Sequence, residues 1–487
     1  MLTKIIAAIL PLLFFAFSFS YSQQDYQKWL RKQQRQLQEF KDARDKAFVE
    51  FLQREWRAMQ LFQGLVPDET PKPTEVPKTA LKEIPAVPST IIKDIHLPEA
   101  PLRKSAEAID WLKSKPTVKE EQVSFSFFNR ELQLNIDKTI INIEVDNPIN
   151  SQQISNFWSA MSLTDYENLL RQAEQLREKM NLNDWGFCLF WNELGRNIYS
   201  DQKNKRHLFV WYLLTKGNYE AKVGYNEKQV YLLLPTQQVI YGAPYFDMNQ
   251  KRYYLISFER GMIDAKEVYT YEGSYPKAEV LVSMNIKNSP LINQIIETKE
   301  LRFNYFGKEH EIHLQLKKDA IDFFQHYPQT EYPIYFNASL SPEANYSLLS
   351  QLKPIIEGKT EIEAVNILLR FVQLAFAYKT DASQFNQEKP FFAEETLFYP
   401  FSDCEDRAVL FAHLVHNLVN LKVIGLDYPG HLATAVKFNS ELKGDFVEYQ
   451  GEKYIVCDPT FINANVGQSM PRFKAITPAV ISIDFRQ

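Results

Sequence analysis

One cysteine stands at the start of an apolar stretch, and a histidine and an aspartate that each border a predicted strand follow it. Cys404 lies in the run Ser-Asp-Cys-Glu-Asp-Arg of residues 402–407, and residues 408–418 predict an apolar helix. The dipole and the unpaired N–H groups of a helix N-terminus stabilise a thiolate, and these N–H groups can also bind an oxyanion. His431 opens an apolar run of strand type, and Asp458 follows a second one. The order Cys, His, Asp suggests nucleophilic catalysis by a thiol.

The three side chain types suit distinct roles. A thiol needs a base to ionise it near neutral pH, and an imidazole base needs an acceptor that fixes its tautomer. If the strands of His431 and Asp458 pair antiparallel, we expect both side chains on one face, over the start of the Cys404 helix. The motifs resemble those of the transglutaminase-like superfamily of papain-like cysteine enzymes, over roughly residues 366–473. The resemblance implies that Cys404 is the nucleophile, His431 the base and Asp458 the orienting acid, on a helix packed against a sheet.

The most specific parts of this resemblance are Asp-Cys-Glu-Asp at 403–406 and Asp-Pro-Thr at 458–460. One departure is the interval of 27 residues from His431 to Asp458, which is longer than is usual in that superfamily. It predicts an extended hairpin through residues 441–445.

Structural readings of the same residues stay open beside the catalytic one. Cys404 could be a small buried hydrophobe, as a lone cysteine often is. Glu405 and Asp406 could simply complement the helix dipole, and their charge would oppose thiolate formation. We expect Cys188 and Cys457 in the core, the latter because the proposed acid beside it on the strand faces the other side.

The N-terminus predicts export. Residues 1–22 have a lysine, an apolar run and small residues at the spacing of a signal-peptidase site, which indicates a cleaved signal peptide and a periplasmic or secreted protein. Its apolar run is shorter than the roughly 20 residues of a membrane span, so we expect no transmembrane anchor after cleavage. Three cysteines are too few for a disulfide framework, and their odd number leaves a free thiol. A net charge of −5 with both signs interspersed predicts no nucleic acid partner.

Two further segments precede the body of the chain. Apolar residues at three- and four-residue steps predict a long amphipathic helix over 23–64, which could form a coiled coil or bind a protein partner. Residues 65–118 are rich in proline and predict an extended linker.

The body shows an internal duplication, with modules at 119–290 and 291–487. Residues 123–131 resemble 301–309 at an offset of 178, and later pairs match at an offset of 201. The change of offset predicts an insertion of about 22 residues before Cys404. The expected fold class is α+β, with two tandem modules of helices and mixed or antiparallel sheets.

At the larger offset, Lys203, Val230 and Ser257 take the places of the three proposed catalytic residues. The first module therefore reads as a degenerate transglutaminase-like copy without the chemistry. The insertion carries the aromatic stretch 391–400, which could form one wall of a cleft or fill the core.

The leading hypothesis is a secreted cysteine enzyme that forms a thioester at Cys404 on a protein or peptide amide and hydrolyses it, as a peptidase or amidase does. Transfer of the acyl group to an amine, as in a transglutaminase, is the alternative within enzymes. A third reading is a non-catalytic periplasmic scaffold whose working parts are the long helix and the first module. No phosphate loop or zinc spacing occurs, so we predict no cofactor and no metal.

Overall fold

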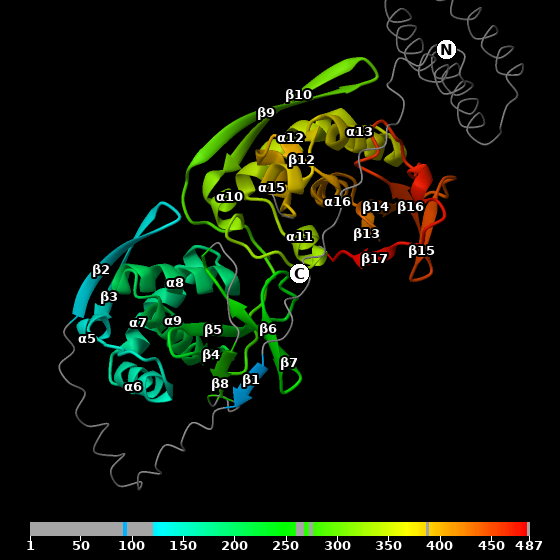
Figure 1. The fold of residues 1–487 in the computed structure, drawn as a ribbon. Helices are drawn as coiled ribbons and strands as arrows, with labels where there is room; N and C mark the ends of the chain where they lie inside the picture. Colours follow the sequence, from blue (N-terminus) through cyan, green and yellow to red (C-terminus); the bar gives the residue numbers. More distant parts are fainter. Residues whose placement is uncertain are drawn as a thin grey trace, which may run out of the picture. The chain divides into compact units, whose positions relative to one another are not determined.

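The computed structural model describes residues 91–94, 120–259, 267–271, 275, 277–385 and 389–484. The predicted signal peptide, the long helix and nearly all of the proline-rich linker lie outside these residues. The described chain has an α+β fold with helices and two curled antiparallel five-strand sheets (Figure 1). None of its described helices is both long and apolar enough to cross a membrane.

The first region begins with a β-hairpin, continues through helices and ends in a sheet. Its elements are β2 (Glu120–Phe127), β3 (Arg130–Asp137), α5 (Lys138–Ile141), α6 (Ser151–Ser162), α7 (Tyr166–Lys179), α8 (Asp184–Tyr199), α9 (Lys203–Lys216), β4 (Lys222–Tyr225), β5 (Val230–Pro235), β6 (Tyr245–Met248), β7 (Lys251–Ile256) and β8 (Glu267–Thr270). A further strand, β1 (Ile91–Asp94), pairs in parallel with β8.

The second region repeats this succession. Its elements are β9 (Ile296–Tyr305), β10 (Lys308–Lys317), α10 (Lys318–Phe324), α11 (Tyr332–Asn337), α12 (Pro342–Ile356), α13 (Glu361–Leu374), β11 (Ala377–Tyr378), α14 (Asp381–Phe385), α15 (Ala393–Phe398), β12 (Phe401–Ser402), α16 (Cys404–Val419), β13 (Lys422–Tyr428), β14 (His431–Lys437), β15 (Phe446–Tyr449), β16 (Glu452–Cys457), the 3₁₀ helix η1 (Pro471–Phe473) and β17 (Ala479–Ser482).

The two sheets share one strand order. In the first the antiparallel strands run β8-β4-β5-β7-β6, and in the second they run β17-β13-β14-β16-β15. Each strand of one sheet therefore has a counterpart at the same place in the other. The long interval before Asp458 holds the edge strand β15, which forms a tight hairpin with β16, so the predicted hairpin begins after residues 441–445 rather than running through them.

A glutamine side chain fastens each hairpin to a helix in the same way. The Gln172 side chain of α7 accepts from the Asn135 N–H and donates to its C=O, at 3.0 and 2.8 Å. In the second region, the Gln351 side chain of α12 makes the same pair of bonds with the His313 backbone, at 3.0 and 2.6 Å. Each clamp satisfies both backbone groups of one strand residue, which fixes the hairpin against its helix.

Each sheet also has a glycine where the neighbouring strand passes closely. A Cβ at Gly224 would lie 2.3 Å from Val268 Cγ1 of β8, and one at Gly425 would lie 3.0 Å from Ile481 Cβ of β17. Both positions therefore require a residue without a side chain.

The two regions differ most between the helices that precede the sheet. Three residues separate α8 from α9, whereas β11, α14, α15 and β12 separate α13 from α16. The insertion thus lies just before Cys404, as the sequence predicted. Phe391 and Phe392 within it are buried, stacking on Tyr399 at 4.7 Å and on Phe324 at 4.4 Å between ring centroids. Both rings thus pack in the core here, and Phe392 also lines a small pocket beside Tyr327 and Tyr335.

Candidate active site

Cys404 is the first residue of α16, and it is buried. Asp403 precedes the helix in an extended conformation, and its N–H donates to Asp406 Oδ2 at 3.1 Å. The backbone N–H of Leu432, the residue after His431, is hydrogen-bonded to the Cys404 thiol. The sulfur thus lies beside the first turn of its helix and the start of β14.

His431 is the first residue of β14, and Asp458 follows the last residue of the neighbouring antiparallel strand β16. His431 Nε2 lies 2.8 Å from Asp458 Oδ2, and each side chain is 2% exposed. The second carboxylate oxygen, Oδ1, accepts from the N–H groups of Thr460 and Phe461 at 2.9 and 3.1 Å. Because a carboxylate only accepts, this geometry places the ring proton on Nε2 and leaves the Nδ1 lone pair for another proton.

The loop after Asp458 is held by a residue that the sequence did not single out. Gln373 on α13 donates to the carbonyls of Asp458, Phe461 and Ala464 at 3.2, 2.9 and 3.1 Å. Its Oε1 accepts from the Asn463 N–H at 3.0 Å. A buried amide that bonds several loop carbonyls fixes the Asp458 backbone. Only the fold brings α13 to this loop, so no local sequence signal could have identified Gln373.

The protonation of Cys404 differs from the expectation based on the helix N-terminus. Burial, and then the negative charges of Glu405 and Asp403, raise the pKa of the thiol well above its usual value. The Cys404 thiol donates to Glu405 Oε2 at 3.0 Å. The bond from the Leu432 N–H opposes this rise without overcoming it. Burial and the neighbouring carboxylates thus favour the thiol form of Cys404 in this conformation and oppose the stabilisation of a thiolate that a helix N-terminus provides.

The other two cysteines lie in the core, as expected. Cys188 and Cys457 are fully buried, and burial raises the pKa of both thiols. All three cysteines are free.

A buried arginine forms hydrogen bonds at the start of α16. Arg407 donates to Ser402 Oγ at 3.0 Å and to the carbonyls of Gln373 and Phe376 at 3.4 and 2.8 Å. Burial lowers the pKa of Arg407 to about 10. These bonds tie the first turn of α16 to the end of α13. Arg407 therefore acts on the position of the helix rather than by a direct bond to the thiol.

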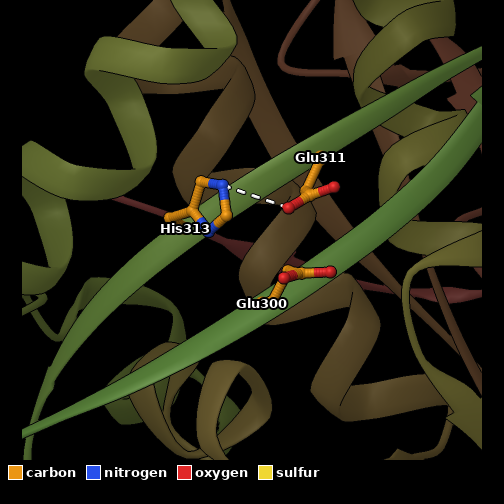
Figure 2. Close-up of side chains that lie close together, drawn as sticks. All are labelled: Glu300, Glu311 and His313. Carbon is orange, nitrogen blue, oxygen red and sulfur yellow. Dashed lines mark ion pairs between the residues drawn. The ribbon is translucent and has the colours of Figure 1, made fainter.

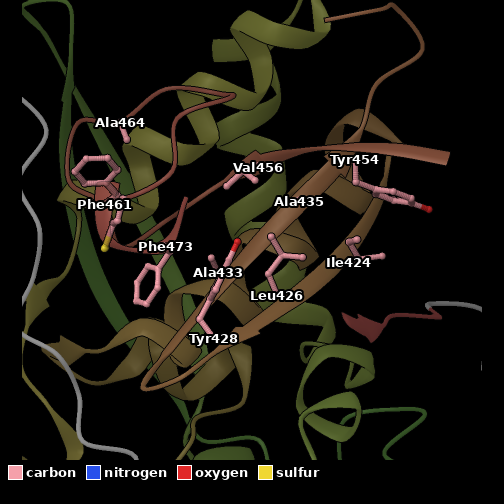
Figure 3. Close-up of a cluster of buried hydrophobic side chains, with 11 residues drawn as sticks. Ile424, Leu426, Tyr428, Ala433, Ala435, Tyr454, Val456, Phe461, Ala464 and Phe473 are labelled. Atoms are coloured by element: carbon pink, nitrogen blue, oxygen red, sulfur yellow. The ribbon is translucent and has the colours of Figure 1, made fainter. Parts of the chain in front are cut away.

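One face of the His431 ring is covered by Phe473 of η1. The two rings are stacked, with centroids 4.9 Å apart and planes 4° apart, and Tyr428 stacks on Phe473 at 4.8 Å. Figure 3 shows Phe473 and Tyr428 within the apolar cluster on the sheet of β13, β14 and β16. Phe473 thus closes this face of the His431 ring to solvent in the described conformation.

The first region places other residues at the corresponding points. Lys203 begins α9, Val230 begins β5, and Ser257 directly follows β7. In the second region, Cys404 likewise begins α16, His431 begins β14, and Asp458 directly follows β16. Lys203 forms an ion pair with Glu259 at 3.5 Å, and the Ser257 hydroxyl donates to the Glu259 carbonyl at 2.9 Å. This site holds no nucleophile, base and acid in that order.

Within the part of the chain that the structure describes, two groups of side chains have the residue types of a metal site. Asp381, Asp403 and Asp406 are buried with oxygens close together, and each accepts from a backbone N–H. Burial and neighbouring carboxylates raise the pKa of Asp403 and that of Asp406 well above the usual range.

The second group is exposed on the β9–β10 hairpin. Figure 2 shows Glu300, Glu311 and His313 close together, with His313 Nε2 3.2 Å from Glu311 Oε1. The Arg302 guanidinium pairs with both carboxylates, at 2.5 and 3.4 Å. This group therefore forms an internal ion-pair network on the hairpin surface.

Comparison of the chain with protein-family models, with curated proteins and with solved structures found no match. The arrangement itself carries the functional argument: a thiol at a helix start, beside a strand whose histidine is oriented by a buried aspartate.

Proposed function

We propose that the protein is a cysteine enzyme that forms a thioester at Cys404 on an amide carbonyl and hydrolyses it, as a peptidase or amidase does. The observation that carries the proposal is the bond of 2.8 Å between His431 and Asp458, two buried side chains beside the start of the Cys404 helix. Burying an imidazole against a carboxylate costs desolvation, and an apolar pair would fill the space more simply. The first region has an apolar residue, Val230, at the position that corresponds to His431, so this strand position does not require a histidine for folding.

In the reaction, His431 Nδ1 takes the thiol proton while Asp458 keeps the other ring proton on Nε2. The thiolate attacks the amide carbon and forms a C–S bond, and the backbone N–H groups of the first turn of α16 stabilise the oxyanion. The imidazolium then protonates the leaving amine as the C–N bond breaks. Water, deprotonated by His431, releases the acid and restores the thiol.

Transfer of the acyl group to an amine uses the same side chains and remains the second candidate. The buried surroundings of Cys404 and His431 favour it in one respect, because a site that excludes water gives a bound amine the advantage as acceptor. The non-catalytic scaffold is the third candidate, and it assigns no role to the bond between His431 and Asp458.

The fold supports a further part of the proposal, namely that the first region is a degenerate copy of a transglutaminase-like second region. The shared strand order, the two glutamine clamps and the two crowded glycines are the support. Arg206 on α9 and Arg407 on α16 stand at the same helical position, and both are buried. A buried arginine at this helical position is thus common to both regions, whereas the proposed triad is confined to one. We also propose a protein or peptide substrate and a periplasmic or secreted location.

The test is covalent labelling of the purified protein with a thiol-reactive amide mimic, followed by peptide mapping. We expect adduct at Cys404, and we expect it to fall sharply in His431→Ala. Cys404→Ala is the control for label at the other cysteines. Equal labelling of Cys404 with and without His431 would refute the proposed mechanism.

A further inference from the structure

The residue after the proposed nucleophile makes an unusual bond. Glu405 is 1% exposed, and its Oε2 accepts from the Cys404 thiol at 3.0 Å. Its Oε1 is buried and has no hydrogen-bond partner. A glutamate in the first turn of a helix ordinarily complements the dipole or accepts from first-turn N–H groups. Here one carboxylate oxygen accepts from the thiol instead, so dipole complementation alone does not explain the burial of Glu405.

The charges around Glu405 oppose a second negative charge at the sulfur. Asp403 and Asp406 flank it on the same turn, and Asp427 of β13 also feels its charge. The Arg407 guanidinium directs its hydrogen bonds to carbonyls and to Ser402 rather than to these carboxylates. A carboxylate 3.0 Å from a sulfur stabilises the S–H form and repels the S⁻ form.

We propose that Glu405 is a positioning residue that holds Cys404 in a resting thiol state, with the S–H bond directed at its carboxylate instead of at His431. This inference rests on the proposed role of Cys404 as nucleophile. Activation then consists of a movement of the Glu405 side chain away from the sulfur. This movement frees the thiol proton for transfer to His431 and removes the repulsion of the thiolate.

The chain offers a matched control for this role. Glu395 on α15 is also 1% exposed, but its carboxylate accepts from Lys389 Nζ at 2.7 Å and from the Phe392 N–H at 3.2 Å. Replacing Glu405 or Glu395 by glutamine removes one buried carboxylate in each case. Only the first replacement changes the partner of Cys404.

The experiment measures the rate of Cys404 alkylation by iodoacetamide from pH 6 to pH 10, by peptide mapping, in the wild type, Glu405→Gln and Glu395→Gln. We expect the midpoint of the pH profile to fall by at least about one pH unit in Glu405→Gln, which is a rate gain of about tenfold at pH 7. The Glu395→Gln profile should keep the wild-type midpoint. Thermal unfolding of all three proteins shows whether a substitution destabilises the fold. Destabilisation would expose Cys404 and raise its alkylation rate without moving the midpoint of the pH profile.

The outcomes separate this inference from the proposed function. An unchanged or higher midpoint in Glu405→Gln, with Cys404 still dependent on His431 for labelling by the amide mimic, overturns the role of Glu405 and leaves the nucleophile in place. Labelling that does not depend on His431 refutes the proposed mechanism, even if Glu405→Gln shifts the midpoint.

Discussion

Replacing Asp458 by asparagine tests the proposed orientation of His431 most directly. Asp458 accepts from His431 at one oxygen and from the N–H groups of Thr460 and Phe461 at the other. An asparagine has one accepting oxygen and one donating nitrogen, so it can meet only one side of this arrangement. If its oxygen faces His431, its NH₂ group faces two N–H donors, and both lose their acceptor.

The magnitude follows from those two donors. Each buried N–H without an acceptor costs about 1–3 kcal/mol, so this orientation is disfavoured by about 2–6 kcal/mol. The asparagine therefore turns its NH₂ group to His431 Nε2, which must then accept, and the ring proton moves to Nδ1. That tautomer has no lone pair at Nδ1 for the thiol proton. At a factor of ten per 1.4 kcal/mol, we expect labelling of Cys404 by the amide mimic to fall roughly 30-fold to 10⁴-fold.

The assay is the second-order rate of labelling at pH 7, with unfolding by urea measured in parallel. Asp445→Asn is the control, because Asp445 also accepts from a backbone N–H, that of Ser469 at 2.9 Å, away from the triad. It should leave the labelling rate within about twofold, as expected of a position that does not contact the reacting groups. Wild-type labelling in Asp458→Asn, with the fold intact, would refute the argument from the tautomer.

Three further predictions concern stability. Burial raises the pKa of Asp403 above its value in the unfolded chain, so the ionisation of Asp403 lowers the stability of the fold as pH rises from about 4 towards the raised pKa. Asp403→Asn should therefore have a higher Tm than the wild type at pH 7 and the same Tm near pH 4. A Tm difference that does not change with pH would contradict this prediction. Arg407→Lys keeps the charge but loses at least two of the three bonds, which should lower the urea unfolding free energy by about 3 kcal/mol or more; a wild-type value would show that the brace is unimportant. Gly425→Ala places a Cβ 3.0 Å from Ile481 Cβ and should cost about 1–3 kcal/mol in the same assay, whereas no loss would mean that β17 moves aside freely.

Much of the described fold was predictable because local patterns repeat. The alternating residues 123–131 and 301–309 predicted a strand and then a turn in each region, and the change of offset predicted additional residues before Cys404. Burial of the same faces of strands and helices fixes topology in each region, so weak sequence similarity was enough to align them. The inserted phenylalanines were ambiguous, because aromatic side chains suit a core and a binding rim equally well.

The site was predictable in its residues and less so in its electrostatics. The ends of predicted strands placed His431 and Asp458 beside each other, and their bond of 2.8 Å agrees with that placement. The pKa of Cys404 depends on where the Glu405 side chain points and on complete burial, and neither can be derived from the order of residues. The Gln373 bonds to the loop after Asp458 join residues about 90 apart in the chain, so only the folded structure shows them.

The corresponding positions in the first region bear on how this architecture can change. Lys203, Val230 and Ser257 occupy the ends of three elements whose order matches that of the second region. Both regions keep a buried arginine one turn into the helix, while the residues at the three element ends differ in type between the regions. The same succession of elements therefore forms with two different sets of residues at these three ends. Under the proposed function, a change of chemistry at the three ends leaves the order of helices and strands as it is.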